Sequence, residues 1–189
     1  RQCSKTRPNL NKMRLLPFYF ALFLFTQCTE LEPRKPLNKT KDDFIKVSAA
    51  RNKIQFTQEE QAIKKAISIE KELDYRPSQS GFWLAYKAQG DTLQALPKKG
   101  DIAHFRYQIE NLSQELIYSE EELGTVDYPV DEDNFLPALR EGIRILRPGD
   151  VVVFLFPSYL CYGYQGDGEK IGINQPLRIT LKLLSIDYK

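Results

Sequence analysis

Cysteine and histidine, the usual ligands of zinc, are scarce in this chain of 189 residues. Three cysteines and one histidine are present, and they do not occur at the short spacings that place four ligands around zinc. Asp131-Glu132-Asp133 is acidic like a calcium loop, but it lacks glycine at the sixth position and glutamate at the twelfth, so we interpret it as a solvated acidic turn. The glycine-rich residues 163–172 lack the Gly-Lys-Ser/Thr of a phosphate loop. The sequence therefore predicts neither a metal nor a cofactor.

The charge distribution argues against a nucleic-acid partner. The chain has 27 basic and 25 acidic residues, but five of the basic residues and none of the acidic ones lie within residues 1–27. The remainder therefore has an acidic excess of three, whereas phosphate binding is driven by a basic surplus. The mild overall basicity belongs to the amino-terminal segment alone.

The amino-terminal segment has the pattern of an export signal. Met13, the only methionine, precedes Arg14 and an apolar run of 11 residues, 15–25. A run of this length fits a secretory signal, because a membrane-spanning helix needs about 20 residues. The run closes on Cys28, which resembles the lipobox of bacterial lipoproteins except that Gln27 replaces the usual small residue. We expect Cys28 to be lipidated and Met13 to be the start, with residues 1–12 an upstream extension; an ordinary cleaved signal or an apolar helix are the alternatives.

Four segments follow from these patterns: a leader (1–27), a lipid-anchored tether (28–56), a lead-in helix (57–79) and a folded domain (80–189). The tether begins with prolines and charged residues. Thr57-Gln58-Glu59-Glu60 has the spacing of a capping box, and apolar residues then recur at helical intervals. This predicts a helix over residues 58–73 that packs on the domain; a partner-binding helix is the alternative. With Cys28 lipidated and Cys161 alone in the domain, no disulfide is expected.

The sequence of residues 80–189 predicts an α+β fold. Apolar and polar residues alternate over 82–86, 102–110 and 177–183, which predicts strands with one buried face, and His104 falls on the outward side as a surface histidine. Residues 151–156 are all apolar, as in a strand covered on both faces. Residues 134–142 predict one short helix, because Asn134 can cap it, Pro137 fits its first turn and Gly142 can close it. One helix laid across an antiparallel sheet is the expected architecture.

Five segments in this order resemble the FKBP-type peptidyl-prolyl isomerases, over residues 80–187. They are Lys99-Gly100-Asp101 with the strand ending in Tyr107, the helix Phe135-Leu136-Pro137-Ala138-Leu139-Arg140-Glu141-Gly142, the turn Leu146-Arg147-Pro148-Gly149-Asp150, the signature Pro157-Ser158-Tyr159-Leu160-Cys161-Tyr162-Gly163, and the closing strand at 171–184. The resemblance implies an antiparallel, twisted β-sheet wrapped over one short helix and preceded by an amino-terminal helix. The longer chain, with its leader, is similar to the gliding-motility-associated FKBP lipoproteins of Bacteroidetes.

The resemblance implies prolyl cis/trans isomerisation of proline-containing polypeptides, which needs no cofactor. Rotating an X-Pro bond requires only that a barrier of about 18–20 kcal/mol, which arises from amide resonance, be lowered. A dry, apolar pocket favours the twisted amide because it is less dipolar than the planar one. The alternative is a non-catalytic chaperone or assembly module of a gliding or secretion apparatus. We expect a monomer in the cell envelope, lipid-anchored, facing the periplasm.

The family's site residues fall on identifiable positions of this sequence. By resemblance, Tyr162 donates its hydroxyl to a substrate carbonyl, Leu136 donates its backbone amide, and Tyr107 lines the pocket. Four positions depart from the family. Tyr118 stands where aspartate is usual, Leu139 where the best-known members have tryptophan, and Ile117 and Ile179 where phenylalanine is usual. Residues 163–172 would form a mobile flap, and Cys161 a buried hydrophobic residue. The other expected substrate-binding residues are Ile117, Val126, Tyr128, Phe135, Ile171 and Ile179.

Overall fold

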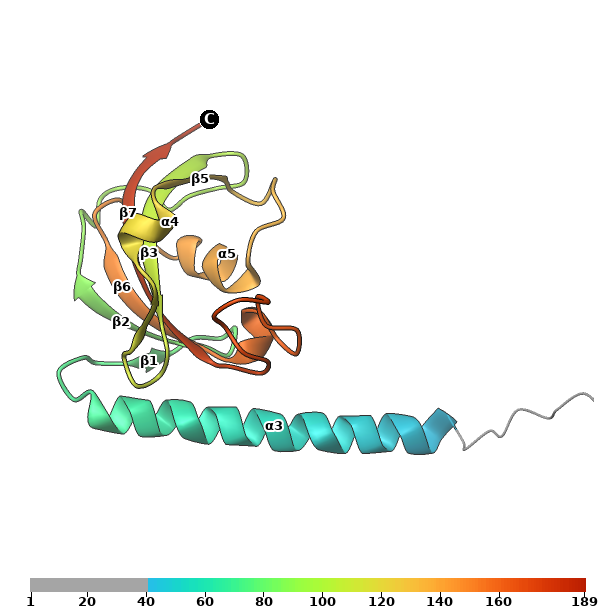
Figure 1. Ribbon diagram of the computed structural model, residues 1–189. Coiled ribbons are helices and arrows are strands. Elements are labelled where there is room, and N and C mark those ends of the chain that lie inside the picture. Colours follow the sequence, from blue (N-terminus) through green and yellow to red (C-terminus); the bar gives the residue numbers. More distant parts are fainter. Residues whose placement is uncertain (1–40) are drawn as a thin grey trace, which may run out of the picture. The chain divides into compact units, whose positions relative to one another are not determined.

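The computed structural model describes residues 41–189 and confirms the α+β architecture (Figure 1). A long helix, α3 (Lys41–Ile69), precedes a seven-stranded sheet whose pairings are all antiparallel, in the order β1-β2-β6-β7-β3-β4 with β5 also on β3. The strands are β1 (Arg76–Pro77), β2 (Trp83–Ala88), β3 (Ile102–Glu110), β4 (Leu116–Tyr118), β5 (Val126–Pro129), β6 (Val151–Phe156) and β7 (Leu177–Asp187). The short helices are α4 (Glu120–Leu123), α5 (Pro137–Ile143) and the 3-10 turn η1 (Ser158–Leu160).

The core lies between the sheet and α5. Five of the six residues of β6 are buried, because this strand has neighbours on both sides and is covered on both faces. Ala138, Leu139 and Ile143 are the buried apolar residues of α5. A side chain at Gly142 would bring its Cβ to 3.2 Å from the Phe154 ring, so glycine at this position allows α5 to approach the sheet closely.

Helix α3 is longer at its start than the sequence predicted. It begins at Lys41, inside the segment expected to be a tether, and ends at Ile69 instead of residue 73. The first half of the helix buries no face, and Phe44 and Ile54 are 75% and 59% exposed. The sequence there lacks the regular spacing of apolar residues from which a helix is predicted. The capping box was wrong, because Thr57 lies mid-helix and donates its hydroxyl to the Lys53 carbonyl.

The second half of α3 packs on the domain, as predicted. Ile63 is fully buried in this half. Beyond the helix end, Glu70 accepts a hydrogen bond from Arg178 Nη2 at 2.8 Å and another from the Tyr75 hydroxyl at 2.6 Å. Arg178 on β7 is 3% exposed and is also paired with Glu110 on β3. One buried guanidinium thus joins the end of the helix to two central strands.

His104 joins three strands at the outer face of the sheet. Its Nδ1 lies 2.6 Å from Asp127 Oδ1 on β5, and its Nε2 lies 3.1 Å from Asp187 Oδ2 on β7. These hydrogen bonds raise the pKa of His104 above its ordinary value. The residue is a surface histidine, as the alternation predicted, but it is held between two carboxylates.

We expect His104 to make stability depend on pH. Because its pKa in the folded state lies above the unfolded value of about 6.5, its contribution is complete below about pH 6.5 and is lost as pH rises through the folded pKa. The free energy of unfolding in urea, measured for the wild type and His104→Gln, should differ most near pH 5.5 and least near pH 8.5. A difference that stays constant over this range would show that protonation of His104 makes no contribution.

Candidate active site

The structure brings all the predicted pocket residues into one hydrophobic cluster. They come from β3, β4, β5, the start of α5, the turn after η1, the following loop and β7. The cluster has two layers, because Tyr128, Leu139, Ile171 and Ile179 are buried and leave no more than 4% of their surface exposed. The half-buried members, which can contact a substrate directly, are Tyr107, Ile117, Tyr118, Val126, Phe135, Leu136 and Tyr162.

Aromatic rings build one wall of this cluster. The Phe135 ring lies 5.3 Å from the Tyr128 ring and 6.0 Å from the Phe105 ring, centroid to centroid, and Phe105 lies 5.7 Å from Tyr107. Edge-to-face and tilted pairs at these distances hold the rings in place. Phe105 was not among the predicted site residues, although the alternation of its strand marks it as inward-facing. Its fully buried ring positions Tyr107 and Phe135 from behind.

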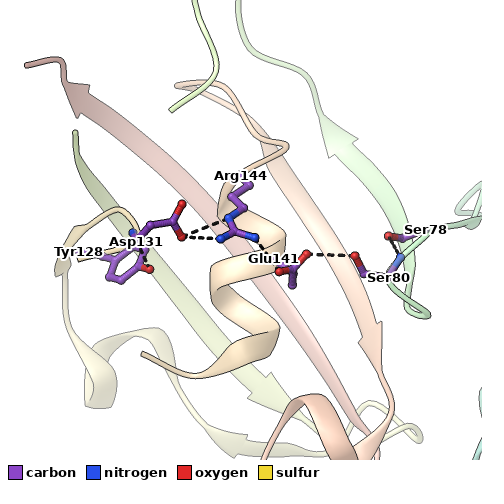
Figure 2. Close-up of polar contacts among 6 residues, drawn as sticks. All are labelled: Ser78, Ser80, Tyr128, Asp131, Glu141 and Arg144. Atoms are coloured by element: carbon purple, nitrogen blue, oxygen red, sulfur yellow. Dashed lines mark hydrogen bonds and ion pairs between the residues drawn. The ribbon is translucent and has the colours of Figure 1, made fainter. Parts of the chain in front are cut away.

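The loop that presents Phe135 and Leu136 is fixed to α5 (Figure 2). Arg144 donates to Asp131 Oδ1 from Nη2 at 2.7 Å and to Glu141 Oε1 from Nη1 at 2.8 Å. The expectation of a solvated acidic turn is therefore wrong for Asp131, since an arginine 13 residues further along the chain binds its carboxylate. Leu136 is the N-cap of α5, and its carbonyl accepts hydrogen bonds from the first turn of the helix.

Tyr107 and Tyr162, two of the four tyrosines of the site, stay protonated at neutral pH. Burial raises the pKa of Tyr107, and burial together with Tyr107, Cys161 and Asp167 raises the pKa of Tyr162 to about 12. Within residues 41–189 the Tyr162 hydroxyl makes no hydrogen bond to another group, so its proton is available to a substrate carbonyl. Burial also raises the pKa of the Cys161 thiol, in keeping with its interpretation as a hydrophobic residue rather than a reactive thiol.

Tyr118 connects β4 to the expected flap, residues 163–172. Its hydroxyl donates to Asp167 Oδ2 at 2.6 Å, and Asp167 Oδ1 accepts from the Glu169 and Ile171 amides, both at 2.8 Å. Desolvation raises the pKa of Asp167, but these hydrogen bonds outweigh it and hold the pKa below its ordinary value. Lys170 lies 4.4 Å from the Tyr118 ring centroid. Sequence reasoning missed Asp167, although an aspartate followed by glycine is typical of a tight turn.

Glu59 of α3 fixes the turn that leads to Tyr162. The carboxylate of Glu59 is 4% exposed and accepts from the Ser158 amide at 2.8 Å and the Ser158 hydroxyl at 2.6 Å. The Ser158 carbonyl in turn accepts from the Cys161 and Gly163 amides, both at 2.9 Å. Tyr162 lies between Cys161 and Gly163, whose amides both donate to Ser158. Because Glu59 binds Ser158, it also fixes the backbone on both sides of Tyr162. No signal in the sequence connects positions 99 residues apart.

Comparison with known proteins identifies the class of this domain. Residues 94–184 match the family model for FKBP-type peptidyl-prolyl cis-trans isomerases. The strand-rich domain therefore belongs to the FKBP-type peptidyl-prolyl cis-trans isomerase family.

Individual relatives agree with that assignment. The probable FKBP-type isomerase FkpA of Neisseria meningitidis serogroup B is 32% identical over 108 residues, a match that spans 57% of this chain and only 38% of that protein. The crystal structure of FkpA from Escherichia coli has a TM-score of 0.57 at 16% identity and covers 96% of this chain and 84% of that one. A peptidyl-prolyl isomerase from Pseudomonas syringae pv. tomato has a TM-score of 0.58 at 14% identity, covering 72% and 96%. These two structures show the shared fold.

We expect Glu59→Ala to destabilise the protein by about 1–3 kcal/mol, because the buried Ser158 amide and hydroxyl would lose their acceptor. The neighbouring Glu60→Ala is the matched control. Glu60 is exposed and pairs with Lys64 one helical turn away, its one ion pair within residues 41–189, so its loss should cost about 0.5 kcal/mol or less. Guanidinium unfolding of both variants measures the two costs, and equal small losses would contradict the structural role of Glu59.

Proposed function

We propose that this protein catalyses cis/trans isomerisation of X-Pro bonds in polypeptides. The observation that carries the proposal is the Tyr162 hydroxyl, a protonated donor at the rim of an apolar, aromatic-lined cluster. Family membership of the domain supports the same activity. The arrangement supplies hydrogen-bond donors and an apolar surface, which this reaction needs, and the reaction requires neither a nucleophile nor a general base.

The proposed mechanism lowers the rotational barrier by environment. The planar amide is stabilised by resonance that a polar medium favours, so transfer of the bond to an apolar pocket disfavours the planar form relative to the twisted transition state. Phe135 and Tyr107 contribute apolar ring surface around the proline. Tyr162 donates to a carbonyl of the substrate, and the Leu136 amide, which donates to no backbone carbonyl within residues 41–189, supplies a second hydrogen bond.

We expect Tyr162→Phe to reduce the isomerase rate about tenfold, since the ring stays and one hydrogen bond, worth about 1–2 kcal/mol, is lost. Tyr86→Phe is the control, because Tyr86 lies on β2 and is not a member of the cluster. Both are assayed by acceleration of a refolding reaction limited by proline isomerisation. Equal activity of the wild type and Tyr162→Phe would contradict the role of the hydroxyl.

A second candidate function is a non-catalytic chaperone or assembly module that supports gliding motility or secretion. The observation that favours it is at Tyr118, where the family's aspartate is replaced and the hydroxyl is engaged by Asp167. Leu139, at the family's tryptophan position, reduces the aromatic surface of the pocket. A wild-type protein that suppresses aggregation of an unfolded client without accelerating its proline-limited refolding would select this candidate over the isomerase.

We also propose that the protein is a monomer anchored in the cell envelope, facing the periplasm, through lipid on Cys28. The support is the signal-like run before Cys28, which lies outside the described residues. Within residues 41–189 no helix has the length and apolar character needed to cross a bilayer.

We expect labelled palmitate to enter the wild-type protein in a bacterial host that acylates lipoproteins, and not to enter Cys28→Ala. Loss of the thiol removes the atom on which the lipid anchor would be formed. Cys161→Ala serves as the control and should label like the wild type, since Cys161 lies far from the signal-like run in the sequence. Equal labelling of wild type and Cys28→Ala, or no labelling of either, would overturn the anchor.

A further inference from the structure

A cleft of about 470 Å³ lies between α3 and the segment that bears Tyr162. One wall comes from α3, with Asn52, Gln55 and Phe56. The other wall comes from residues 158–165 and Asn174. Its volume is within the range of pockets that bind ligands. Tyr162 lines this cleft and also belongs to the hydrophobic cluster of the candidate active site, so the cleft lies next to that site.

The chemistry of the cleft walls fits an uncharged polypeptide. Aromatic surface is exposed there, at 49% for Phe56, 47% for Tyr159 and 77% for Tyr164, and the Phe56 and Tyr159 rings meet edge to face at 5.2 Å. Side-chain amides, which can both donate to and accept from a peptide backbone, complete the lining. They belong to Asn52, Gln55, Gln165 and Asn174.

Glu59 is the one charged residue among those that line the cleft, within the part of the chain that the structure describes. Its carboxylate is already bound, because it accepts from the Ser158 amide, the Ser158 hydroxyl and Gln55 Nε2 at 2.8, 2.6 and 2.9 Å. Because three donors already occupy the oxygens of this carboxylate, it attracts a cation only weakly. The same contacts fix the two walls to each other, so the cleft is formed before a ligand arrives.

We propose that this cleft is a second binding subsite that holds the residues flanking the proline in a client polypeptide. The inference rests on the proposed function, because it places the proline beside Tyr162. A chain whose carbonyl accepts from the Tyr162 hydroxyl must continue along the surface next to that residue, and the cleft offers aromatic and amide groups there. Uncharged segments that contain apolar or aromatic residues are the class of client it suits. Helix α3 is then part of the substrate site.

Phe56→Ala tests the subsite, with Phe44→Ala as the matched control on the same helix. Phe44 is 75% exposed and does not line the cleft. The probe is a fluorescein-labelled, uncharged peptide of about 12 residues with one central Ala-Pro, about 40 Å when extended. Anisotropy titration should show about tenfold weaker binding for Phe56→Ala, as is typical when an aromatic residue that the ligand covers is truncated, and unchanged binding for Phe44→Ala. Gln165→Ala, on the opposite wall, should also weaken binding.

Isomerisation kinetics separate the subsite from the activity. The subsite predicts that Phe56→Ala raises KM for the long peptide, leaves its kcat unchanged and leaves kcat/KM for a four-residue proline peptide unchanged. Equal effects on the long and short peptides, or none in the titration, would overturn the subsite while leaving the isomerase intact. A wild-type protein that binds the long peptide through Phe56 but isomerises neither substrate would instead overturn the isomerase and retain the cleft as a polypeptide-binding site.

Discussion

The contact between the Glu59 carboxylate and Ser158 is the interaction on which the site depends. A buried carboxylate is stable only when its oxygens are hydrogen-bonded, and here both oxygens accept from one residue of the domain. Helix α3 is thereby fixed to the turn before Tyr162. The Arg178 guanidinium makes a second connection, between Glu70 after the helix and Glu110 in the sheet. Because breaking either contact would leave a buried charge or donor unpaired, the helix and the domain behave as one unit.

The elements that follow local rules could be predicted from the sequence. Alternation located β2, β3 and β7, and the continuous apolar run located β6, whereas β1, β4, β5 and α4 were not predicted. Pro137 located the start of α5. The expected cap and end of this helix were wrong, because Leu136 rather than Asn134 is its N-cap and Gly142 lies inside it. The pocket positions came from the resemblance, and they lie together in one cluster because the order of strands places them there. The sequence could not reveal contacts between distant positions, such as Tyr118 with Asp167, 49 residues apart. It also missed the first half of α3, since an exposed helix leaves no periodic pattern of buried residues.

Tyr118 and Asp167 show how the chain departs from the family while keeping a carboxylate near the pocket. The family's aspartate is absent from position 118, and a tyrosine there binds an aspartate supplied by residues 163–172. The carboxylate is held by two backbone amides as well as by the tyrosine. A segment that resemblance would describe as a mobile flap is thus connected to β4, and polarity beside Tyr162 is retained by a different route.

Native-state hydrogen exchange most directly tests whether α3 and the domain form one unit. If they do, amides of the helix between residues 59 and 69 will exchange with the same free energy as those of β6 and β7, because the helix can open only when the domain unfolds. Helix amides that exchange as fast as those of an isolated peptide, while β6 and β7 remain protected, would contradict the account.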